Sequence, residues 1–355
     1  MVMVRKPILI LLIAVIGFWG YLYFQTPKEE VSLGMPAFNP AGLDWKEATS
    51  TIPWAKRDAH AVVVYKNKIW LLGGIEGEKK ECDKGYCKYW EFPHKNDVWN
   101  SEDGKSWEQI TKTSPWLPRR SLTAVVFKDK IWMLGGWEQR TGLTKNDVWN
   151  TEDGVNWVLA TSSAAWSSRE GHSLLAFNNK MWLLAGVDFD KKKIMNDIWF
   201  SEDGISWFQV TSTIPWQPRY DQAAAVFDNK IWLTGGVDPD GESLNDIWVS
   251  ENGLDWSLVS EKAEWPARHG HTMEVFQDRL WLISGWNTEK NEGLKDVWYS
   301  ADGYFWQKTQ KEILWEGRED HASAVFRNRI WLLGGMDTNW TWRKDIWCSV
   351  SFYSF

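Results

Sequence analysis

The block Asn196-Asp197-Ile198-Trp199 decides the fold of this chain, because it and its surroundings return about every 50 residues. Self-similarity at this period indicates one supersecondary unit that is copied along the chain. The repeats predict one large ring instead of the two ordinary domains that a length of 355 residues suggests. The six copies carry Asp97, Asp147, Asp197, Asp246, Asp296 and Asp345, spaced by 50, 50, 49, 50 and 49 residues.

Each copy divides into four short strands, and the third copy is a clear example. Its predicted strands are residues 172–177, 180–186, 196–200 and 206–210, with Asn178-Asn179 as a hairpin turn and residues 201–204 as a second turn. The apolar runs are too short for helices, and no helical periodicity is visible. Six such units predict an all-β fold, a six-bladed β-propeller with four-stranded antiparallel blades.

The ends of the chain predict how the ring closes. The sixth copy has three strands and then the chain ends, so its fourth strand is missing. The segment Gly42-Leu43-Asp44-Trp45 matches Gly253-Leu254-Asp255-Trp256, which begins the fourth strand of the fourth copy. We therefore expect the N-terminal strand to complete the last blade, which removes an exposed sheet edge.

The repeat resembles the Kelch-repeat family of β-propellers over residues 42–350. The resemblance rests on an Arg-x-x-His before the first strand, a Trp in the outer strand, and paired glycines after the second strand. These pairs are Gly73-Gly74, Gly135-Gly136, Gly235-Gly236 and Gly334-Gly335, with Ala185-Gly186 and Ser284-Gly285 as degraded copies. The turn in Ser101–Trp107 also resembles the Asp-box of sialidase-type propellers, shortened by one residue. In those families this turn is a folding device.

The N-terminus predicts a membrane segment. Residues 7–24 are apolar and uncharged, follow Arg5 and Lys6, and approach the roughly 20 residues that span a bilayer. We expect residues 1–27 to form a signal-anchor, residues 28–40 a tether, and residues 41–355 the propeller. The positive flank places the propeller outside the cytoplasm, in the periplasm or at the cell surface. A cleaved signal peptide is the alternative, and the protein would then be secreted.

Charge and cysteine content limit the partners and cofactors. The net charge of −7 disfavours binding to nucleic acid or to anionic lipid. Cys82 and Cys87 share one polar loop, where a local disulfide would suit an exported protein. The pair lacks the further ligands of a metal site, and Cys348 occupies a packed position. We expect no cofactor and no metal.

Most of the 30 tryptophans are repeated, and repeated residues are expected to pack between blades. The exceptions outside the N-terminal segment lie in loops between the second and third strands, all on one face. Exposed tryptophans there would suit sugar stacking or a protein hot spot. The alternative is that they fold back as lids on the blades. The four predicted contacts are Trp137, Trp286, Trp340 and Trp342, and Trp90 lies in the longest of these loops.

Two further sets surround the predicted central channel. An arginine ring would either hold a carboxylate or brace neighbouring carbonyls and the recurrent aspartates. Its members are Arg57, Arg119, Arg169, Arg219, Arg268 and Arg318. Four histidines would either bind a metal or simply occupy the family's usual histidine position. These are His60, His172, His271 and His321.

These features predict a membrane-anchored, monomeric Kelch-like propeller that binds a protein or a glycan through one loop face. One alternative is an envelope assembly scaffold. Another is a sugar epimerase or mutarotase acting on an acidic sugar such as sialic acid, by resemblance to periplasmic Kelch-type epimerases. That resemblance implies that the arginine ring grips the sugar carboxylate while Glu170 or Glu319 moves a proton.

Overall fold

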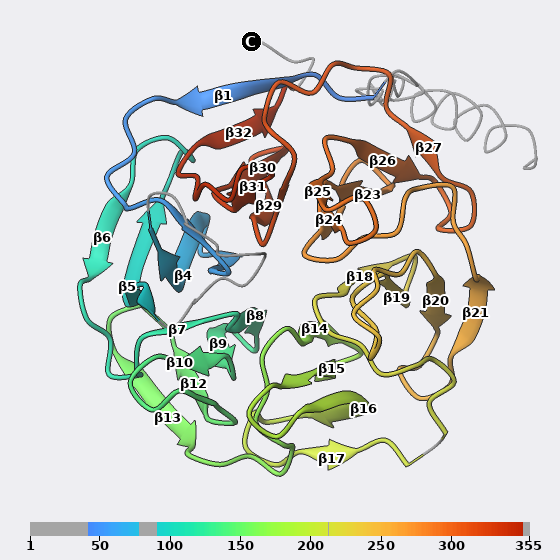
Figure 1. Cartoon of the computed structure of the whole chain (residues 1–355). Helices are drawn as coiled ribbons and strands as arrows, with labels where there is room; N and C mark the ends of the chain where they lie inside the picture. The colour runs from blue at the N-terminus through green and yellow to red at the C-terminus, as the bar shows by residue number, and fades with distance from the viewer. Residues whose placement is uncertain (1–41, 78–90, 212, 351–355) are drawn as a thin grey trace, which may run out of the picture. The chain divides into compact units, whose positions relative to one another are not determined.

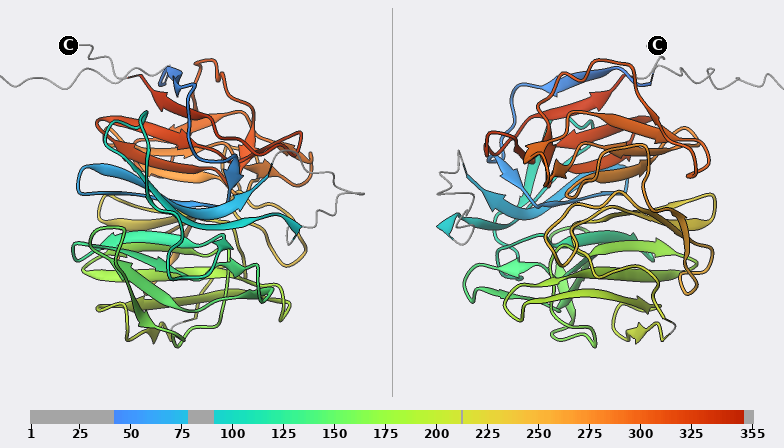
Figure 2. Two further views of the ribbon diagram at one scale, coloured as in Figure 1. Left: turned by 90° about the vertical axis from the view of Figure 1, so that its left-hand side faces the viewer. Right: turned by 45° about the vertical axis from the view of Figure 1, so that its right-hand side comes forward.

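The structure, a computed structural model, describes residues 42–77, 91–211 and 213–350. Residues 39–355 form one compact unit that contains all of them. Figure 1 shows this unit as a ring of small antiparallel sheets around a central axis, and Figure 2 shows the same sheets from two sides. The predicted membrane segment, the tether, Trp90 and the Cys82–Cys87 pair lie outside the described residues. Within those residues, no helix is long and apolar enough to cross a membrane.

Six sheets form the blades: five have four strands, and the first has a fifth, short strand, β2 (Arg57–Asp58), beside its four. Blade 1 consists of β3 (Ala61–Tyr65), β4 (Lys68–Glu76), β5 (His94–Ser101) and β6 (Glu108–Thr111). Blade 2 has β8 (Thr123–Phe127), β9 (Lys130–Leu134), β12 (Val148–Thr151) and β13 (Trp157–Thr161). Blade 3 has β14 (Ser173–Phe177), β15 (Lys180–Asp188), β16 (Lys193–Ser201) and β17 (Phe208–Gln209). Blade 4 has β18 (Ala223–Phe227), β19 (Lys230–Thr234), β20 (Ile247–Ser250) and β21 (Ser257–Ser260).

Blade 5 has β22 (Thr272–Val275), β23 (Leu280–Ile283), β26 (Val297–Ser300) and β27 (Gln307–Lys308). Blade 6 has β29 (Ala322–Phe326), β30 (Arg329–Leu333), β32 (Ile346–Ser349) and, from the other end of the chain, β1 (Trp45–Thr49). Strand β1 pairs with β32, with Trp45 opposite Ser349. The innermost strands also contact one another in a continuous cycle, β3–β8–β14–β18–β22–β29–β3. Strand β1 thus supplies the fourth strand of the last sheet, which agrees with the predicted closure by the N-terminal strand.

The repeated tryptophans pack between and within the blades, as expected. The crossover tryptophan of each blade is buried, and Trp54, Trp116, Trp166, Trp216, Trp265 and Trp315 are each 1% exposed. Five of the six crossover rings meet a fourth-strand tryptophan edge to face. The rings of Trp166 and Trp207, for example, lie 6.1 Å apart at an interplanar angle of 82°. Aromatic pairs of this geometry add stability beyond the area they bury.

The shortened Asp-box turns join neighbouring blades. In blade 3, the backbone N–H groups of Ile205 and Ser206 donate to Asp203 Oδ1 at 2.8 and 2.7 Å. Gly204 has a φ of 78°, and a Cβ atom on it would lie 2.1 Å from the ring of Trp132 in blade 2. The turn therefore needs glycine both for its backbone conformation and for its contact with the next blade.

Short strands mark one face of the ring. They are β2 (Arg57–Asp58), β7 (Arg119–Arg120), β10 (Trp137–Glu138), β11 (Leu143–Thr144), β24 (Trp286–Asn287), β25 (Glu292–Gly293), β28 (Arg318–Glu319) and β31 (Met336–Asp337). Some of them join the segment before a first strand to the chain after the second strand, as where β28 pairs with β31 and β7 with β10. Others form hairpins within the loop after the second strand, as where β24 pairs with β25. These pairings fix the backbone at the mouth of the central channel.

Candidate functional site

The recurrent arginines are clamps inside the blades. Arg169 donates from Nη1 to Asp197 Oδ1 at 2.6 Å and from Nη2 to Asp197 Oδ2 at 2.9 Å. Nη1 also donates to the carbonyl oxygen of Ala185 at 2.7 Å. The aspartate accepts a further bond from Trp199 Nε1 at 2.8 Å. Burial alone raises the pKa of Asp197, but the bonds and charge of Arg169 bring it below its usual value.

All six arginines make the same two-pronged contact, and all are at most 1% exposed. The equivalent pairs are Arg57–Asp97, Arg119–Asp147, Arg219–Asp246, Arg268–Asp296 and Arg318–Asp345. The prediction that this ring holds a ligand carboxylate is therefore corrected, because every guanidinium group is already committed to its own blade. The alternative in which the arginines brace carbonyls and the recurrent aspartates describes the structure.

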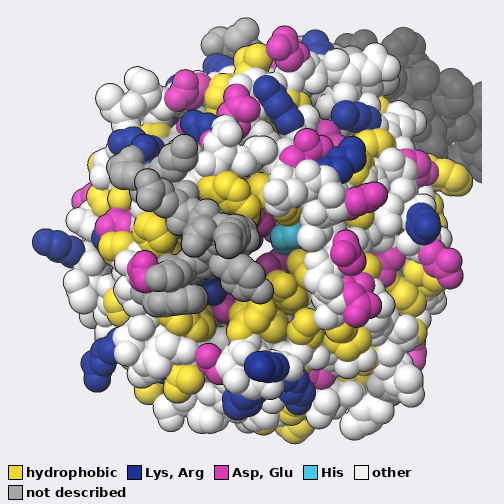
Figure 3. Space-filling view, in the orientation of Figure 1, with side chains coloured by type: hydrophobic (Ala, Val, Ile, Leu, Met, Phe, Trp, Pro, Cys, Tyr) yellow, Lys and Arg dark blue, Asp and Glu magenta, His cyan; other side chains and the backbone are white. Residues whose placement is uncertain are grey.

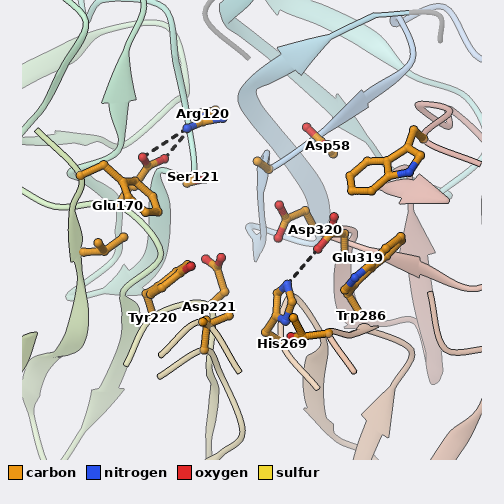
Figure 4. Close-up of a pocket in the computed structure, with 17 residues that line it drawn as sticks. Asp58, Arg120, Ser121, Glu170, Tyr220, Asp221, His269, Trp286, Glu319 and Asp320 are labelled. Atoms are coloured by element: carbon orange, nitrogen blue, oxygen red, sulfur yellow. Dashed lines mark hydrogen bonds and ion pairs between the residues drawn. The ribbon is translucent and has the colours of Figure 1, made fainter. Parts of the chain in front are cut away.

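The residue after each arginine behaves differently, because it is polar but varies from blade to blade. The six residues are Asp58, Arg120, Glu170, Tyr220, His269 and Glu319. We call these six the mouth layer. All of them line one cavity of about 320 Å³, and Figure 4 shows their side chains around it. Small-molecule pockets range from roughly 300 to 1,000 Å³, so this cavity suits a small ligand.

The mouth layer is held by its backbone. Each of its residues pairs with the first residue after the paired small residues of the same blade. Asp58 pairs with Ile75, Arg120 with Trp137, Glu170 with Val187, Tyr220 with Val237, His269 with Trp286, and Glu319 with Met336. Side chains of different chemistry are thus presented at equivalent positions around the axis on a rigid support.

One ion pair and one histidine–carboxylate contact organise the mouth layer. Arg120 Nε lies 3.2 Å from Glu170 Oε2, and its Nη2 donates to Glu170 Oε1 at 3.3 Å. His269 Nε2 lies 3.2 Å from Glu319 Oε2, while its Nδ1 lies 2.9 Å from Ser243 Oγ. Burial of Glu170 raises the pKa of that carboxyl despite the nearby arginine. Burial also raises the pKa of the Tyr220 hydroxyl, and neighbouring carboxylates add to the effect.

A second layer lies one residue further along each blade and forms the floor of the cavity. It consists of Ala59, Ser121, Gly171, Asp221, Gly270 and Asp320, all with φ between 48° and 61°. Backbone N–H groups in this layer donate to carbonyls of the next blade, as from Asp320 to Gly270 at 2.9 Å. The two aspartates are the only charged members. Burial raises the pKa of Asp221 to about 6 and that of Asp320 well above its usual range.

Aromatic side chains form part of the cavity wall. Trp286, Trp340, Phe189 and Tyr220 all line it. The rings of Trp286 and Trp340 lie 4.9 Å apart, and Phe189 meets Tyr220 edge to face at 5.4 Å. Figure 3 shows a hollow at the centre of this face, with a histidine and acidic side chains inside it. The cavity therefore offers both carboxylates and flat apolar surfaces to a ligand.

Two of the four tryptophans predicted as ligand contacts line the cavity, and the other two do not. Trp286 and the half-buried Trp340 line the cavity, but Trp342 is 0% exposed and packs beside Met336. Trp137 is 9% exposed, between His94 at 5.1 Å and the guanidinium of Arg120 at 5.3 Å. The expectation of exposed tryptophans on the loops is therefore corrected. The loops are short enough to turn these rings inward, as the lid alternative describes.

The four recurrent histidines lie below the floor, around an inner cavity of about 200 Å³. Burial, together with a nearby arginine, lowers the pKa values of His60, His172 and His321 to about 3. Burial, together with Arg268, His269 and His321, also holds the pKa of His271 well below its usual value. These imidazoles are neutral at physiological pH. Among the described residues, no group of three or more His, Cys, Asp or Glu side chains is arranged to hold a metal ion.

The repeat pattern concealed most of the mouth layer. Glu170 and Glu319 entered the prediction as acids, whereas Asp58, Arg120, Tyr220 and His269 did not. The signal was present in the sequence, because a polar residue follows every recurrent arginine and no such residue type occupies more than two blades. Variation at one position inside an otherwise strict repeat marks a place where the scaffold does not dictate the side chain.

The closed ring of four-stranded blades, with a polar cavity on its axis, defines a β-propeller. A family model described as the KLHDC2/KLHL20/DRC7 Kelch-repeats domain matches residues 25–213. A second model, the Kelch motif, matches residues 218–249. The chain belongs to the Kelch-repeat family, and the resemblance carried by its glycine pairs and repeated arginines is confirmed.

The similarity of this chain to a solved structure extends to the fold and does not indicate an activity. The solved structure of YjhT has a TM-score of 0.66 with this chain at 16% sequence identity. The match covers 82% of this chain and 94% of that chain. No curated protein sequence matches the chain. At this level of identity, the likeness to YjhT shows a shared propeller fold.

Proposed function

We propose that this Kelch propeller binds a carbohydrate in the cavity at the mouth of its channel. The observation that carries the proposal is the mouth layer, where six varied polar side chains converge from positions that are otherwise equivalent. Scaffold requirements alone give one residue type per position, as the arginine clamps illustrate. Convergent polar groups in a formed pocket are the usual sign of a small-ligand site.

The chemistry of the wall favours a ligand rich in hydroxyl groups. Ionised carboxylates accept hydrogen bonds and donate none, so Glu170, Asp221 and Glu319 suit the hydroxyls of a sugar. The apolar faces of Trp286 and Trp340 suit the C–H face of a sugar ring. A cavity of about 320 Å³ admits one or two sugar rings at most and excludes a folded protein domain.

The proposal includes the location inferred from the sequence. The apolar run at residues 7–24 and its positive flank support a propeller tethered on the outer side of a membrane. Fractionation with protease treatment of intact cells tests this point. We expect the propeller to be digested from outside while remaining in the membrane fraction, and full protection from the protease would contradict the proposal.

A second candidate function is ring-opening catalysis on a sugar. It is favoured by Glu170 and Glu319, two acids on the same cavity, together with Asp221, whose pKa of about 6 suits proton transfer. An acidic sugar is a poorer fit than a neutral one, because carboxyl groups outnumber basic groups on the wall. Polarimetry of freshly dissolved sugars tests this function. An unchanged rate of anomer exchange with added protein would contradict it.

Protein partners are the other class of ligand, since Kelch propellers generally mediate protein interactions. Isothermal titration calorimetry with neutral and amino sugars separates the two classes. We expect heat with at least one sugar, and loss of that heat in the double variant Glu170→Gln/Glu319→Gln. Glu202→Gln is the matched control, because the Glu202 carboxylate is exposed in an Asp-box turn, where it pairs with Lys180. Absence of sugar binding to the unaltered chain would contradict the carbohydrate proposal.

A further inference from the structure

The cavity wall carries more acidic than basic side chains. Five carboxyl groups line it, and the basic side chains on the same wall are Arg120 and His269. Both basic groups already face acids, since Arg120 pairs with Glu170 and His269 with Glu319. The carboxyl groups that line the cavity are Asp58, Glu170, Asp221, Glu319 and Asp320.

Asp221 and Asp320 differ from the paired acids. Within the described residues, neither carboxyl group makes a side-chain hydrogen bond or an ion pair, although both stand at the floor of the cavity. Figure 4 shows both side chains projecting into the space between the mouth residues. The layer beneath does not balance them, because the four buried histidines are uncharged at physiological pH. Two acids that make no direct ion pair are therefore left facing the ligand space, and the basic groups that act on them, Arg120 and His269, already pair with Glu170 and Glu319.

The aromatic walls complement this negative charge. A cation within about 6 Å of an aromatic ring is attracted by the electrons of its face, and most strongly so by tryptophan. Trp286, Trp340 and Tyr220 surround the same space as Asp221 and Asp320. Carboxylates below and aromatic rings beside a small cavity form the arrangement that recognises an ammonium group.

We propose that the ligand of this cavity is a cation, and that it is a sugar bearing a free ammonium group. The inference rests on the proposed function for the sugar and on the floor aspartates for the charge. Asp221 and Asp320 face the ammonium group, while Glu170 and Glu319 accept hydroxyl hydrogen bonds. The same charges that attract the amine make an acidic sugar a poorer ligand.

The test uses three sugars that differ at one carbon: glucosamine, N-acetylglucosamine and glucose. Choline serves as a cation that is not a sugar. Calorimetry on the full chain at pH 7 should give glucosamine an affinity at least about tenfold above that of the other two sugars, because one charge pair at short range contributes that much. Asp221→Asn/Asp320→Asn should remove most of this preference, while Glu202→Gln should retain it.

The outcomes separate the inference from the proposed function. Equal affinity for the three sugars overturns the cationic ligand and leaves carbohydrate binding in place. Binding of choline without any of the sugars overturns the carbohydrate and supports the cation. Binding of none of the four contradicts both. A circular dichroism spectrum of the double variant that matches the unaltered chain shows that any loss arises at the site and not from unfolding.

A pH series gives a second readout that needs no variant. Asp221 is faced by Arg120, His269, Glu170, Glu319 and Asp320, and its pKa of about 6 lies between the two test conditions. Protonation of the floor aspartates removes their charge, so glucosamine should bind several-fold more weakly at pH 5 than at pH 7. Affinity that is unchanged or stronger at pH 5 would overturn the role of these aspartates.

Discussion

Two adjacent positions in every blade differ in residue type and in what their side chains contact, although the same backbone segment carries both. The first always holds arginine, always buried and always clamped to the third-strand aspartate. The next holds six side chains of four chemical kinds, all facing one cavity. Strict repetition therefore marks the residues that build the ring. Variation one residue away marks the part that is left available for binding.

The largest expected effect comes from breaking a clamp. Arg219→Met removes the partner of Asp246, whose carboxylate would remain mostly buried without its two guanidinium bonds. We expect the free energy of unfolding to fall by about 3–5 kcal/mol, as when one partner of a buried ion pair is deleted. Chemical denaturation measures this change.

The neighbouring Tyr220→Phe is the matched control for that clamp. It removes one hydroxyl from the mouth layer and no contact of the scaffold, so stability should change by less than about 0.5 kcal/mol. Equal destabilisation by both variants would remove the distinction between the two positions.

The next effect concerns the turns that join blades. Gly204→Ala should destabilise the ring by about 1–3 kcal/mol, because the new methyl group would overlap the ring of Trp132 at 2.1 Å. Gly241→Ala is its control, since Gly241 also has a positive φ but nothing within 4 Å of an added Cβ. Thermal melting compares them. A larger loss at Gly241 would mean that backbone strain, and not interblade packing, sets the requirement for glycine.

A smaller effect of opposite sign is expected at the floor of the cavity. The folded-state pKa of Asp221 is raised from 3.8 to about 6, so the folded chain binds its proton more tightly than the unfolded chain. This contribution favours folding below pH 4 and is lost as the pH rises through about 6. Asp221→Asn should therefore stabilise the protein at pH 7.5 by on the order of 1 kcal/mol.

The pH profile of that variant is the decisive readout. At pH 3.5 Asp221 is largely protonated in both the folded and the unfolded chain, so the stability gained from asparagine should be small. Melting temperatures at pH 3.5 and 7.5 measure the difference. An equal gain in stability from Asp221→Asn at both pH values would show that the gain does not come from removing the charge of Asp221.

The smallest effect is expected on affinity at the edge of the cavity. Trp340→Ala should weaken sugar binding by about tenfold, a typical loss for one aromatic contact, with little change in stability because the ring is only half-buried. Trp342→Ala should instead destabilise the fold by about 3–5 kcal/mol, because that ring is fully buried. Calorimetry and melting on the two variants test this contrast. Reversed effects would place the binding surface elsewhere on the loops.

Repetition explains what could be predicted from the sequence. Six copies of one unit indicate the strands, the blade count and the missing fourth strand that β1 supplies. They also made bracing a clear alternative for Arg169 and its equivalents, since six identical residues rarely serve one ligand. A repeat pattern, however, gives weight to the residues that its copies share, and therefore does not single out Tyr220 and His269.

The prediction of exposed tryptophans on the loops was wrong for a different physical reason. Their composition indicates large aromatic rings but says nothing of direction, which depends on the pairing of each loop with the preceding segment. Trp286 pairs through its backbone with His269 and Trp137 with Arg120, and these bridges hold both rings against the blades. The raised pKa of Asp221 likewise arises from burial and from acids on other blades, none of them near it in sequence.

The most direct test of the account is a crystal structure of the full chain grown with the tightest-binding sugar of the calorimetric series. We predict density for one sugar inside the mouth layer, with its polar groups within hydrogen-bond distance of Glu170, Asp221 or Glu319 and all six arginine clamps unchanged. Sugar bound on the rim or the opposite face, with the cavity unoccupied, would contradict the assignment of binding to the variable position.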